Sequence, residues 1–298
     1  MYRLGINTGF AVNRYTDPKA WCELINKCDV KSVQLTADLI NPSLPQDLIQ
    51  DQLNQINKQR KNNNITITST FTGAFTRLNH LSHPDIKFRK YWVKWFKKFA
   101  EISVELDSTI MGSHFGILTT NDYNNKEKFE IRKKEAIENW HEIAFYAKKI
   151  GIKTILWEPM SVGREFGETI QKCSSLQEEL NFESPLPFKL CLDVDHGDLS
   201  SSNPDDINPY KWIEKFCLDS PVIHLKQSSS DKGGHWPFTK EHNSKGKIIP
   251  AKIIKILKEK KVKNADLILE LSFKEREPWD SSIENDLMES VKYWRKEL

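Results

Sequence analysis

Eight short apolar runs recur along the chain, and each is followed by a segment with a helical pattern. The runs are often β-branched and hydrophobic nearly throughout, as expected of strands that are buried on both faces. They are LGINTG (4–9), SVQLTA (32–37), ITITST (65–70), STIMGSHFG (108–116), TILWEP (154–159), FKLCLDV (188–194), PVIHLKQ (221–227) and LILELSF (267–273). Strict alternation of strand and helix predicts parallel strands and an α/β fold.

Two of the intervening segments carry a strong helical period. Apolar side chains recur every three to four residues over 88–102 and 137–147, which predicts helices with one face on a core. Weaker helical patterns cover 17–28, 45–61, 167–181, 208–218, 250–260 and 283–296. Two of these begin with a predicted N-cap residue, Asp17 or Asn208, followed by proline in the first helical turn.

Eight strand–helix units predict a closed (β/α)8 TIM barrel that forms a single domain over residues 1–298. An open doubly wound sheet is the structural alternative. Such sheets usually carry a Gly-rich turn after the first strand, whereas NTGFAVN contains one glycine here. No linker, low-complexity tract or internal repeat divides the chain. We therefore expect the closed barrel.

Charge and composition exclude several classes of protein. The 44 basic and 41 acidic side chains leave a net charge of +3, which argues against a dedicated nucleic-acid binder with its clustered basic surface. The start MYRLGINTGF resembles neither a signal peptide nor a membrane anchor, and no segment approaches the roughly 20 apolar residues that span a bilayer. The five cysteines are scattered without a CxxC pair, as is typical of reduced thiols. We expect a soluble, cytoplasmic protein.

Four consecutive strands each present one potential metal ligand at or near the C-terminal end. Glu158 ends the fifth run, Asp193 ends the sixth, His224 lies in the seventh and Glu270 ends the eighth. Taken singly, each has an ordinary explanation as a cap, an ion-pair partner or a satisfied core residue. Active sites of TIM barrels lie at this end of the strands, so together the four predict a shared site.

A cation would explain why three carboxylates converge there. In a dry barrel mouth they would repel one another, and their pKa values would rise. A divalent metal ion removes that penalty. Oxygen donors with one imidazole suit Mn²⁺, Mg²⁺, Co²⁺ or Zn²⁺, and we expect one such ion.

Motifs after the last four strands resemble those of a known family. WEPM, LDVDHG, IHLKQ and ILELSF are similar to the xylose-isomerase-like TIM barrels, in particular to sugar and sugar-phosphate isomerases and epimerases, including ketose 3-epimerases. The longer strings EPMSVGRE, HWPFTKEHNSKG and ILELSFKEREP are most similar to erythrulose-phosphate 3-epimerases. The resemblance covers nearly the whole chain.

The resemblance assigns roles to individual residues. It implies that Glu158, Asp193, His224 and Glu270 bind the metal ion. It also implies that Glu158 and Glu270 are the catalytic acid and base, and that His196 contacts the substrate. Epimerases of free sugars place an arginine six residues after the metal-binding histidine of the seventh strand. This chain has Ser230 there, which argues against a free hexulose substrate.

The expected reaction inverts C3 of a short ketose phosphate, similar to erythrulose phosphate. The metal ion would polarise the carbonyl, and a glutamate on each face of the substrate would remove or return the proton of the enediolate. One glutamate acting alone would instead give aldose–ketose isomerisation. Sequence leaves this choice open.

A phosphate group on the substrate is expected to bind the loops after the seventh and eighth strands, as in many barrels. The alternative is that these loops are ordinary surface. Arg164 could reach the same mouth or pair with Glu165, and His114 could contact substrate or pack beside the site. The expected substrate-binding residues are His114, Arg164, His196, Lys226, Lys232, His235 and Arg276.

Two rival functions remain open. A three-zinc abasic-site endonuclease would need more histidines and carboxylates on strands two to four, where we find Gln34, threonines and His114. A non-catalytic sugar-binding barrel would use the charged cluster only to close the barrel mouth. For the epimerase, the expected partner is a small ketose or ketose phosphate, and we expect binding to neither nucleic acid nor a membrane. The resemblance leaves a homo-oligomer open.

Overall fold

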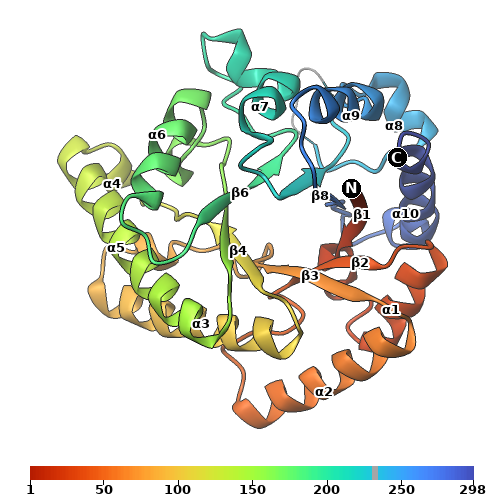
Figure 1. The fold of residues 1–298 in the computed structure, drawn as a ribbon, viewed down its shortest axis with the longest axis horizontal. Coiled ribbons are helices and arrows are strands. Elements are labelled where there is room, and N and C mark those ends of the chain that lie inside the picture. Colours follow the sequence, from red (N-terminus) through yellow and green to blue (C-terminus); the bar gives the residue numbers. More distant parts are fainter. Residues whose placement is uncertain (230–233) are drawn as a thin grey trace.

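Eight parallel strands close into a barrel in which each strand pairs with the next along the chain, and β8 pairs with β1 (Figure 1). The computed structural model describes residues 1–229 and 234–298. The strands are β1 (Tyr2–Asn7), β2 (Ser32–Thr36), β3 (Thr66–Phe71), β4 (Ile110–His114), β5 (Thr154–Glu158), β6 (Phe188–Asp193), β7 (Val222–Leu225) and β8 (Ala265–Leu269). The predicted TIM barrel is confirmed. The open sheet is excluded because β1 and β8 pair directly.

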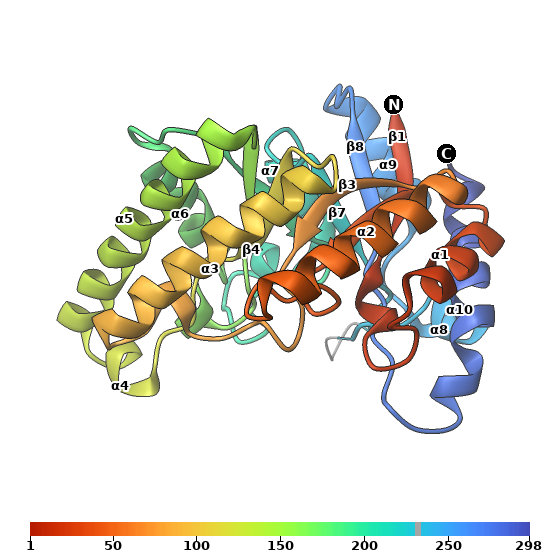
Figure 2. The ribbon, with the colours of Figure 1, turned by 90° about the horizontal axis from the view of Figure 1, so that it is seen from below.

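Helices surround the barrel on the outside (Figures 1 and 2). They are α1 (Pro18–Lys27), α2 (Gln46–Asn62), α3 (Ile86–Glu105), α4 (Thr120–Tyr123), α5 (Lys126–Ile150), α6 (Ile170–Asn181), α7 (Pro209–Phe216), α8 (Lys240–Lys245), α9 (Pro250–Glu259) and α10 (Trp279–Arg295). Short 3-10 helices are η1 (Thr8–Ala11), η2 (His80–Ser82), η3 (Gly163–Glu165) and η4 (Pro204–Ile207). Each predicted helix is present, and the short helices α4 and α8 are additions.

Caps explain where several of the helices begin. The side chain of Asp17 accepts a hydrogen bond from the Lys19 amide, and that of Asn208 accepts one from the Tyr210 amide, so both predicted N-caps are confirmed. Helix α6 begins later than the sequence pattern predicts. Its true cap is Thr169, and the positive φ of +81° at Gly167 is not helical.

Two apolar layers hold the barrel. The larger layer lies between the outer faces of the strands and the helices, where Trp140 of α5 packs on Phe96 of α3 with ring centroids 4.7 Å apart. The smaller one fills the barrel interior and consists of Phe71, Leu156, Cys191, Val222 and Ile268. Gly112 allows this filling, because a Cβ there would lie 2.5 Å from the Phe71 ring.

The interior layer fixes the depth of the polar residues above it. Side chains two residues apart along a strand point to the same face. Leu156, Cys191, Val222 and Ile268 therefore direct the side chains two positions later into the barrel as well. Those later positions are the four predicted ligands, so the strand period delivers all four to the C-terminal mouth.

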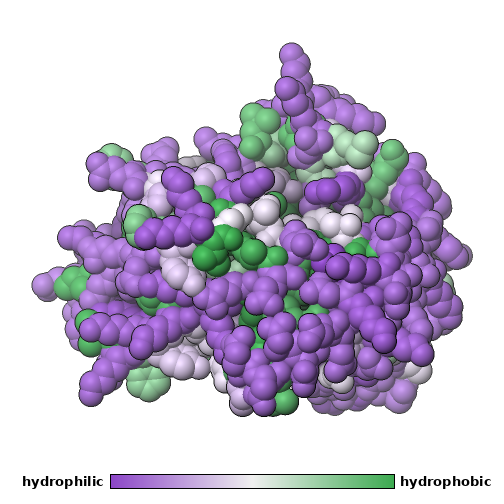
Figure 3. All heavy atoms as spheres, turned by 60° about the horizontal axis from the view of Figure 1, so that its bottom comes forward, coloured by the Kyte–Doolittle hydropathy of each residue, from purple (hydrophilic) through white to green (hydrophobic). Residues whose placement is uncertain are grey.

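The outer surface shown in Figure 3 is mostly hydrophilic, with hydrophobic residues exposed in small groups. In the described part of the chain, every helix is either too short or too polar to cross a bilayer.

Candidate active site

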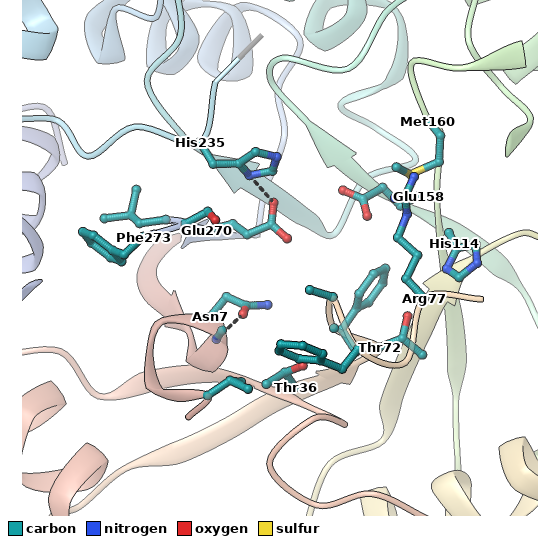
Figure 4. A pocket seen from close by; sticks show the side chains of 18 of the residues that line it. Asn7, Thr36, Thr72, Arg77, His114, Glu158, Met160, His235, Glu270 and Phe273 are labelled. Carbon is teal, nitrogen blue, oxygen red and sulfur yellow. Dashed lines mark hydrogen bonds and ion pairs between the residues drawn. The ribbon is translucent and has the colours of Figure 1, made fainter. Parts of the chain in front are cut away.

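The four predicted ligands meet in the structure. Glu158 and Asp193 are the last residues of β5 and β6, His224 lies in β7, and Glu270 directly follows β8. One ligand atom from each residue lies within 4.8 Å of the other three. Figure 4 shows the carboxylates of Glu158 and Glu270 facing each other across the cavity. Within residues 1–229 and 234–298 this is the one such cluster, whereas a three-metal site would need more ligands.

The cluster fits a divalent cation. Asp193 and His224 are fully buried, and Glu158 is 7% exposed. Oε2 of Glu270 is buried and lacks a hydrogen-bond partner among the described residues, and Oδ2 of Asp193 is buried against the Lys226 ammonium. Buried carboxylate oxygens are costly unless they are paired or coordinate a metal. Three carboxylates and one imidazole around a common centre are a suitable donor set for Mn²⁺, Mg²⁺, Co²⁺ or Zn²⁺.

The two glutamates have different electrostatic surroundings. Burial raises the pKa of Glu270 to about 7. Burial acts in the same direction on Glu158, but the nearby His196 and His224 outweigh it and hold the pKa of Glu158 below its ordinary value. The fold thus gives two carboxylates at one site unequal proton affinities.

A buried lysine lies beside the cluster. Lys226 is 1% exposed, and its Nζ lies 2.7 Å from Asp193 Oδ2, 3.3 Å from His196 Nε2 and 3.0 Å from His235 Nε2. Burial acts to lower the pKa of Lys226, but Asp193 and Glu270 raise it above its ordinary value, so the lysine stays charged. His235, which contacts Lys226, also lies near Glu270, with 3.6 Å between His235 Nδ1 and Glu270 Oε2.

The imidazole of His224 is oriented by contacts on both sides. Its Nδ1 faces the cluster, 3.2 Å from Glu158 Oε1 and 3.5 Å from Glu270 Oε2. Its Nε2 faces the barrel interior, 2.6 Å from Gln34 Oε1 and 3.1 Å from Cys191 Sγ. Nδ1 is therefore the nitrogen available to a metal ion.

The cluster opens into a cavity of about 550 Å³ at the C-terminal mouth of the barrel. Its lining comes mainly from β1, β3, β5, β8 and the loops that follow them. Arg77 lines this cavity and forms an ion pair with the buried Glu165. In Figure 4 the Arg77 side chain points toward the wall that carries Glu158 and Met160. Arg14 also lines the cavity but is paired with Asp280.

The other predicted substrate-binding residues are placed unequally. His114 lines the cavity, with Nε2 3.0 Å from the Leu78 carbonyl, and burial lowers its pKa to about 4. His196 and His235 line it too. Among the described residues, Arg164 and Arg276 are not part of the lining. Arg164 instead lies 3.5 Å from Glu165, the alternative that the sequence left open, and Arg276 is exposed. Lys232 lies outside the described residues.

Sequence reasoning missed three residues at this site. Asn7 and Arg77 line the cavity, and Gln34 contacts His224 from below. Asn7 and Gln34 were visible as uncharged polar residues inside buried strands. Arg77 carried no such signal, because an arginine in a loop is ordinary.

Comparisons with known proteins agree with this architecture. Residues 22–297 match the xylose isomerase-like TIM barrel family. The chain is 41% identical over 293 residues to D-erythrulose 1-phosphate 3-epimerase of Brucella abortus (strain 2308), covering 98% of this chain and 94% of that protein.

Solved structures share the fold. A crystal structure from Rhodospirillum rubrum ATCC 11170, provisionally assigned as a xylose isomerase, superposes with a TM-score of 0.90 at 22% identity and covers 99% of both chains. D-psicose 3-epimerase from Clostridium cellulolyticum H10, crystallised with D-tagatose, superposes with a TM-score of 0.71 at 15% identity and covers 99% of this chain and 98% of its own.

The match to the Brucella epimerase extends over nearly all of both sequences. It confirms the prediction of an enzyme of the isomerase class. The chain belongs to the xylose isomerase-like TIM barrel family.

Proposed function

We propose that this enzyme inverts C3 of a short ketose phosphate of the erythrulose phosphate type. The observation that carries the proposal is the pair of glutamates, Glu158 and Glu270, which come from opposite ends of the β5–β8 arc and face each other across the cavity. Inversion needs a base on one face of the carbon and an acid on the other. The similarity to an erythrulose phosphate epimerase supports the choice of substrate.

The proposed metal ion is held by Glu158, Asp193, His224 and Glu270. When bound, it supplies Lewis-acid polarisation of a ketose carbonyl at neutral pH. Mn²⁺ is the proposed ion, and Mg²⁺, Co²⁺ or Zn²⁺ would satisfy the same donors.

The glutamates carry the proton in the proposed mechanism. One removes the C3 proton to give an enediolate, and the other delivers a proton to the opposite face. Glu158 is buried and the Glu270 side chain is 26% exposed, so access of bulk water to the intermediate is restricted from the side of Glu158. His196 lines the cavity beside Asp193 and would hydrogen-bond a substrate oxygen, whereas Lys226 contacts Asp193 and His196 and is not among the described residues of the lining.

We propose that Arg77 binds the phosphate group of the substrate. Its guanidinium is held at the cavity wall by Glu165, which is 4% exposed, so part of its orientation is fixed before substrate arrives. A guanidinium has five N–H donors, and one carboxylate leaves several free for phosphate oxygens. We therefore assign phosphate binding to Arg77 and not to Arg164 or Arg276, which are not among the described residues of the cavity lining. His235, which was also expected to bind substrate, does line the cavity.

The test of the reaction is NMR of products formed from a tetrulose phosphate in deuterated water with added Mn²⁺. We expect deuterium at C3 together with inversion. Label at C1 or C2 without inversion would show aldose–ketose isomerisation and refute the epimerase. No turnover of any short ketose phosphate, with metal bound, would favour a sugar-binding barrel.

The two glutamates can be tested separately. Glu158→Gln and Glu270→Gln should each abolish inversion, yet each should still exchange the C3 proton of one epimer, and the two variants should act on opposite epimers. Glu241→Gln in α8, an exposed residue outside the cavity lining, is the control and should keep full activity. Inversion at the normal rate by either active-site variant would refute its role.

The phosphate site has a matched pair of variants. Arg77→Met should lower kcat/KM for the phosphorylated substrate about 10- to 100-fold relative to the free sugar, because hydrogen bonds to charged groups contribute about 1.5–3 kcal/mol. Arg164→Met removes the other arginine beside Glu165 and should change that ratio less than about threefold. Equal ratios for Arg77→Met and the unmodified enzyme would refute the assignment.

A further inference from the structure

We infer that Gln34 is a positioning residue that fixes which ring nitrogen of His224 faces the metal site. A chain of hydrogen bonds that starts at the backbone amide of Gly9 and passes through Asn7 sets the orientation of Gln34. The inference rests on the metal site of the proposed function and adds a second layer of residues to it.

The chain starts from a group whose hydrogen-bonding role is certain. The backbone N–H of Gly9 can only donate, and it lies 2.7 Å from Oδ1 of Asn7. This contact orients the Asn7 side-chain amide, so its Nδ2 points away from Gly9. That Nδ2 lies 2.7 Å from Oε1 of Gln34. Because Nδ2 is a donor, the Gln34 atom that it meets must be the carbonyl oxygen.

The same oxygen of Gln34 meets His224. Oε1 lies 2.6 Å from His224 Nε2, and an amide oxygen can accept two hydrogen bonds. Nε2 must therefore carry a hydrogen. The other end of the Gln34 amide donates from Nε2 to Ser69 Oγ at 3.2 Å. Gln34 is fully buried, so water does not compete for these contacts.

The consequence appears on the opposite side of the imidazole. A neutral ring that is protonated on Nε2 has its lone pair on Nδ1. Nδ1 is the nitrogen that faces Glu158 and Glu270. The other tautomer would set two lone pairs 2.6 Å apart, at Gln34 Oε1 and His224 Nε2. Gln34 thus holds the ring in the form that can bind a cation.

The neighbouring cysteine is a poor replacement for Gln34. Cys191 Sγ lies 3.1 Å from His224 Nε2, but a thiol sulfur is only a weak acceptor. Removal of the Gln34 carbonyl should therefore weaken control of the tautomer. Partners of metal-binding histidines typically contribute about 10- to 100-fold to metal affinity.

The test is calorimetric titration of the purified full chain with Mn²⁺ alone. Gln34→Met removes the acceptor at similar length and should weaken Mn²⁺ binding about 10- to 100-fold. Gln34→Glu keeps an acceptor for both Asn7 and His224 and should bind within about threefold of the unmodified protein. Ser69→Ala, the control, removes the hydroxyl that accepts from Gln34 Nε2 without touching Oε1, and this variant should also bind Mn²⁺ within about threefold.

A fourth variant separates the hydrogen-bond chain from general electrostatics. In Asn7→Asp, one oxygen still accepts from Gly9, but the other faces Gln34 and should turn its amide round. His224 Nε2 would then meet a donor, and Mn²⁺ binding should weaken. Simple charge attraction gives the opposite sign, because the variant adds a negative charge near the site. In the ¹⁵N-labelled, Zn²⁺-loaded protein, the Nε2–H signal of His224 should persist in Gln34→Glu and be lost or shifted in Gln34→Met.

Two results would overturn the inference alone: folded Gln34→Met that binds Mn²⁺ with unchanged affinity, or Asn7→Asp that binds more tightly. If Gln34→Met does not fold, the Asn7→Asp and Gln34→Glu titrations decide by their signs. Failure of the unmodified protein to bind Mn²⁺ would refute the metal site of the proposed function and this inference with it.

Discussion

Replacing Lys226 by methionine should destabilise the metal-free protein by about 3–5 kcal/mol. The lysine is 1% exposed, and its Nζ lies 2.7 Å from Oδ2 of the fully buried Asp193. Methionine keeps most of the volume but leaves that carboxylate without its adjacent cation. Loss of one partner of a buried ion pair typically costs about 3–5 kcal/mol. With an unfolding entropy of about 2.1 cal/mol/K per residue, a chain of 298 residues should lose about 5–8 °C in Tm.

The assay is thermal unfolding with a chelator and then with saturating Mn²⁺. In chelator the full loss should appear, whereas Mn²⁺ gives Asp193 a new cationic partner and should narrow the difference between variant and unmodified protein. Lys245→Met is the control: its ion pair with Glu241 is 2.9 Å long, but both side chains are exposed, so it should cost under about 1 kcal/mol. The reasoning is refuted if Lys226→Met has the same Tm as Lys245→Met in chelator. It is also refuted if Mn²⁺ leaves the Tm difference between Lys226→Met and the unmodified protein unchanged.

Four further predictions concern the scaffold. Trp140→Ala should cost about 3–5 kcal/mol in urea unfolding, because the ring is buried and its Nε1 donates to the Phe115 carbonyl at 2.9 Å; a loss under 1 kcal/mol would contradict this packing. Gly151→Ala should cost only about 1 kcal/mol, since φ is +112° but no described atom lies within 4 Å of the added Cβ. A thiol reagent at neutral pH should label none of the five buried cysteines before unfolding and all of them afterwards. Burial raises the pKa of Cys22 to about 12 and that of Cys28 to about 11, so stability should fall as pH rises from about 9 toward 12, where only the unfolded thiols ionise.

The fold was readable from the sequence because strands buried on both faces leave a distinctive pattern. Each of the eight apolar runs overlaps a strand of the barrel. The boundaries of the helices were harder to predict from the sequence than the strands. Helix α5 begins at Lys126, well before the apolar period at 137–147, because its first turns are charged and solvated and are set by the Asn125 cap. The short helices α4 and α8 bury too few apolar side chains to produce a period.

The ligand cluster was readable for an energetic reason. A carboxylate inside an apolar run is costly enough to demand an explanation, and Glu158 and Asp193 both sit in such runs. The arginine that lines the cavity could not be identified in this way from the sequence. Arg164 adjoins Glu165 in sequence, whereas the arginine that lines the cavity beside Glu165 is Arg77, 88 residues earlier. Only the closed barrel brings these residues together.

The barrel also explains why the hydrogen bonds that orient His224 come from β1 and β2, which carry none of the four candidate metal ligands. A histidine that points inward from β7 and offers Nδ1 to the cluster must bury Nε2 in the interior, where water is excluded. An N–H buried in that way requires an acceptor from another strand, since its neighbours on β7 point outward or lie above and below it. Here Gln34 of β2 reaches across the interior, and Asn7 of β1 orients it. The need for this acceptor follows from the closed barrel, which buries His224 Nε2. A substitution at Gln34 should therefore affect the metal site, although Gln34 is far along the chain from the four candidate ligands.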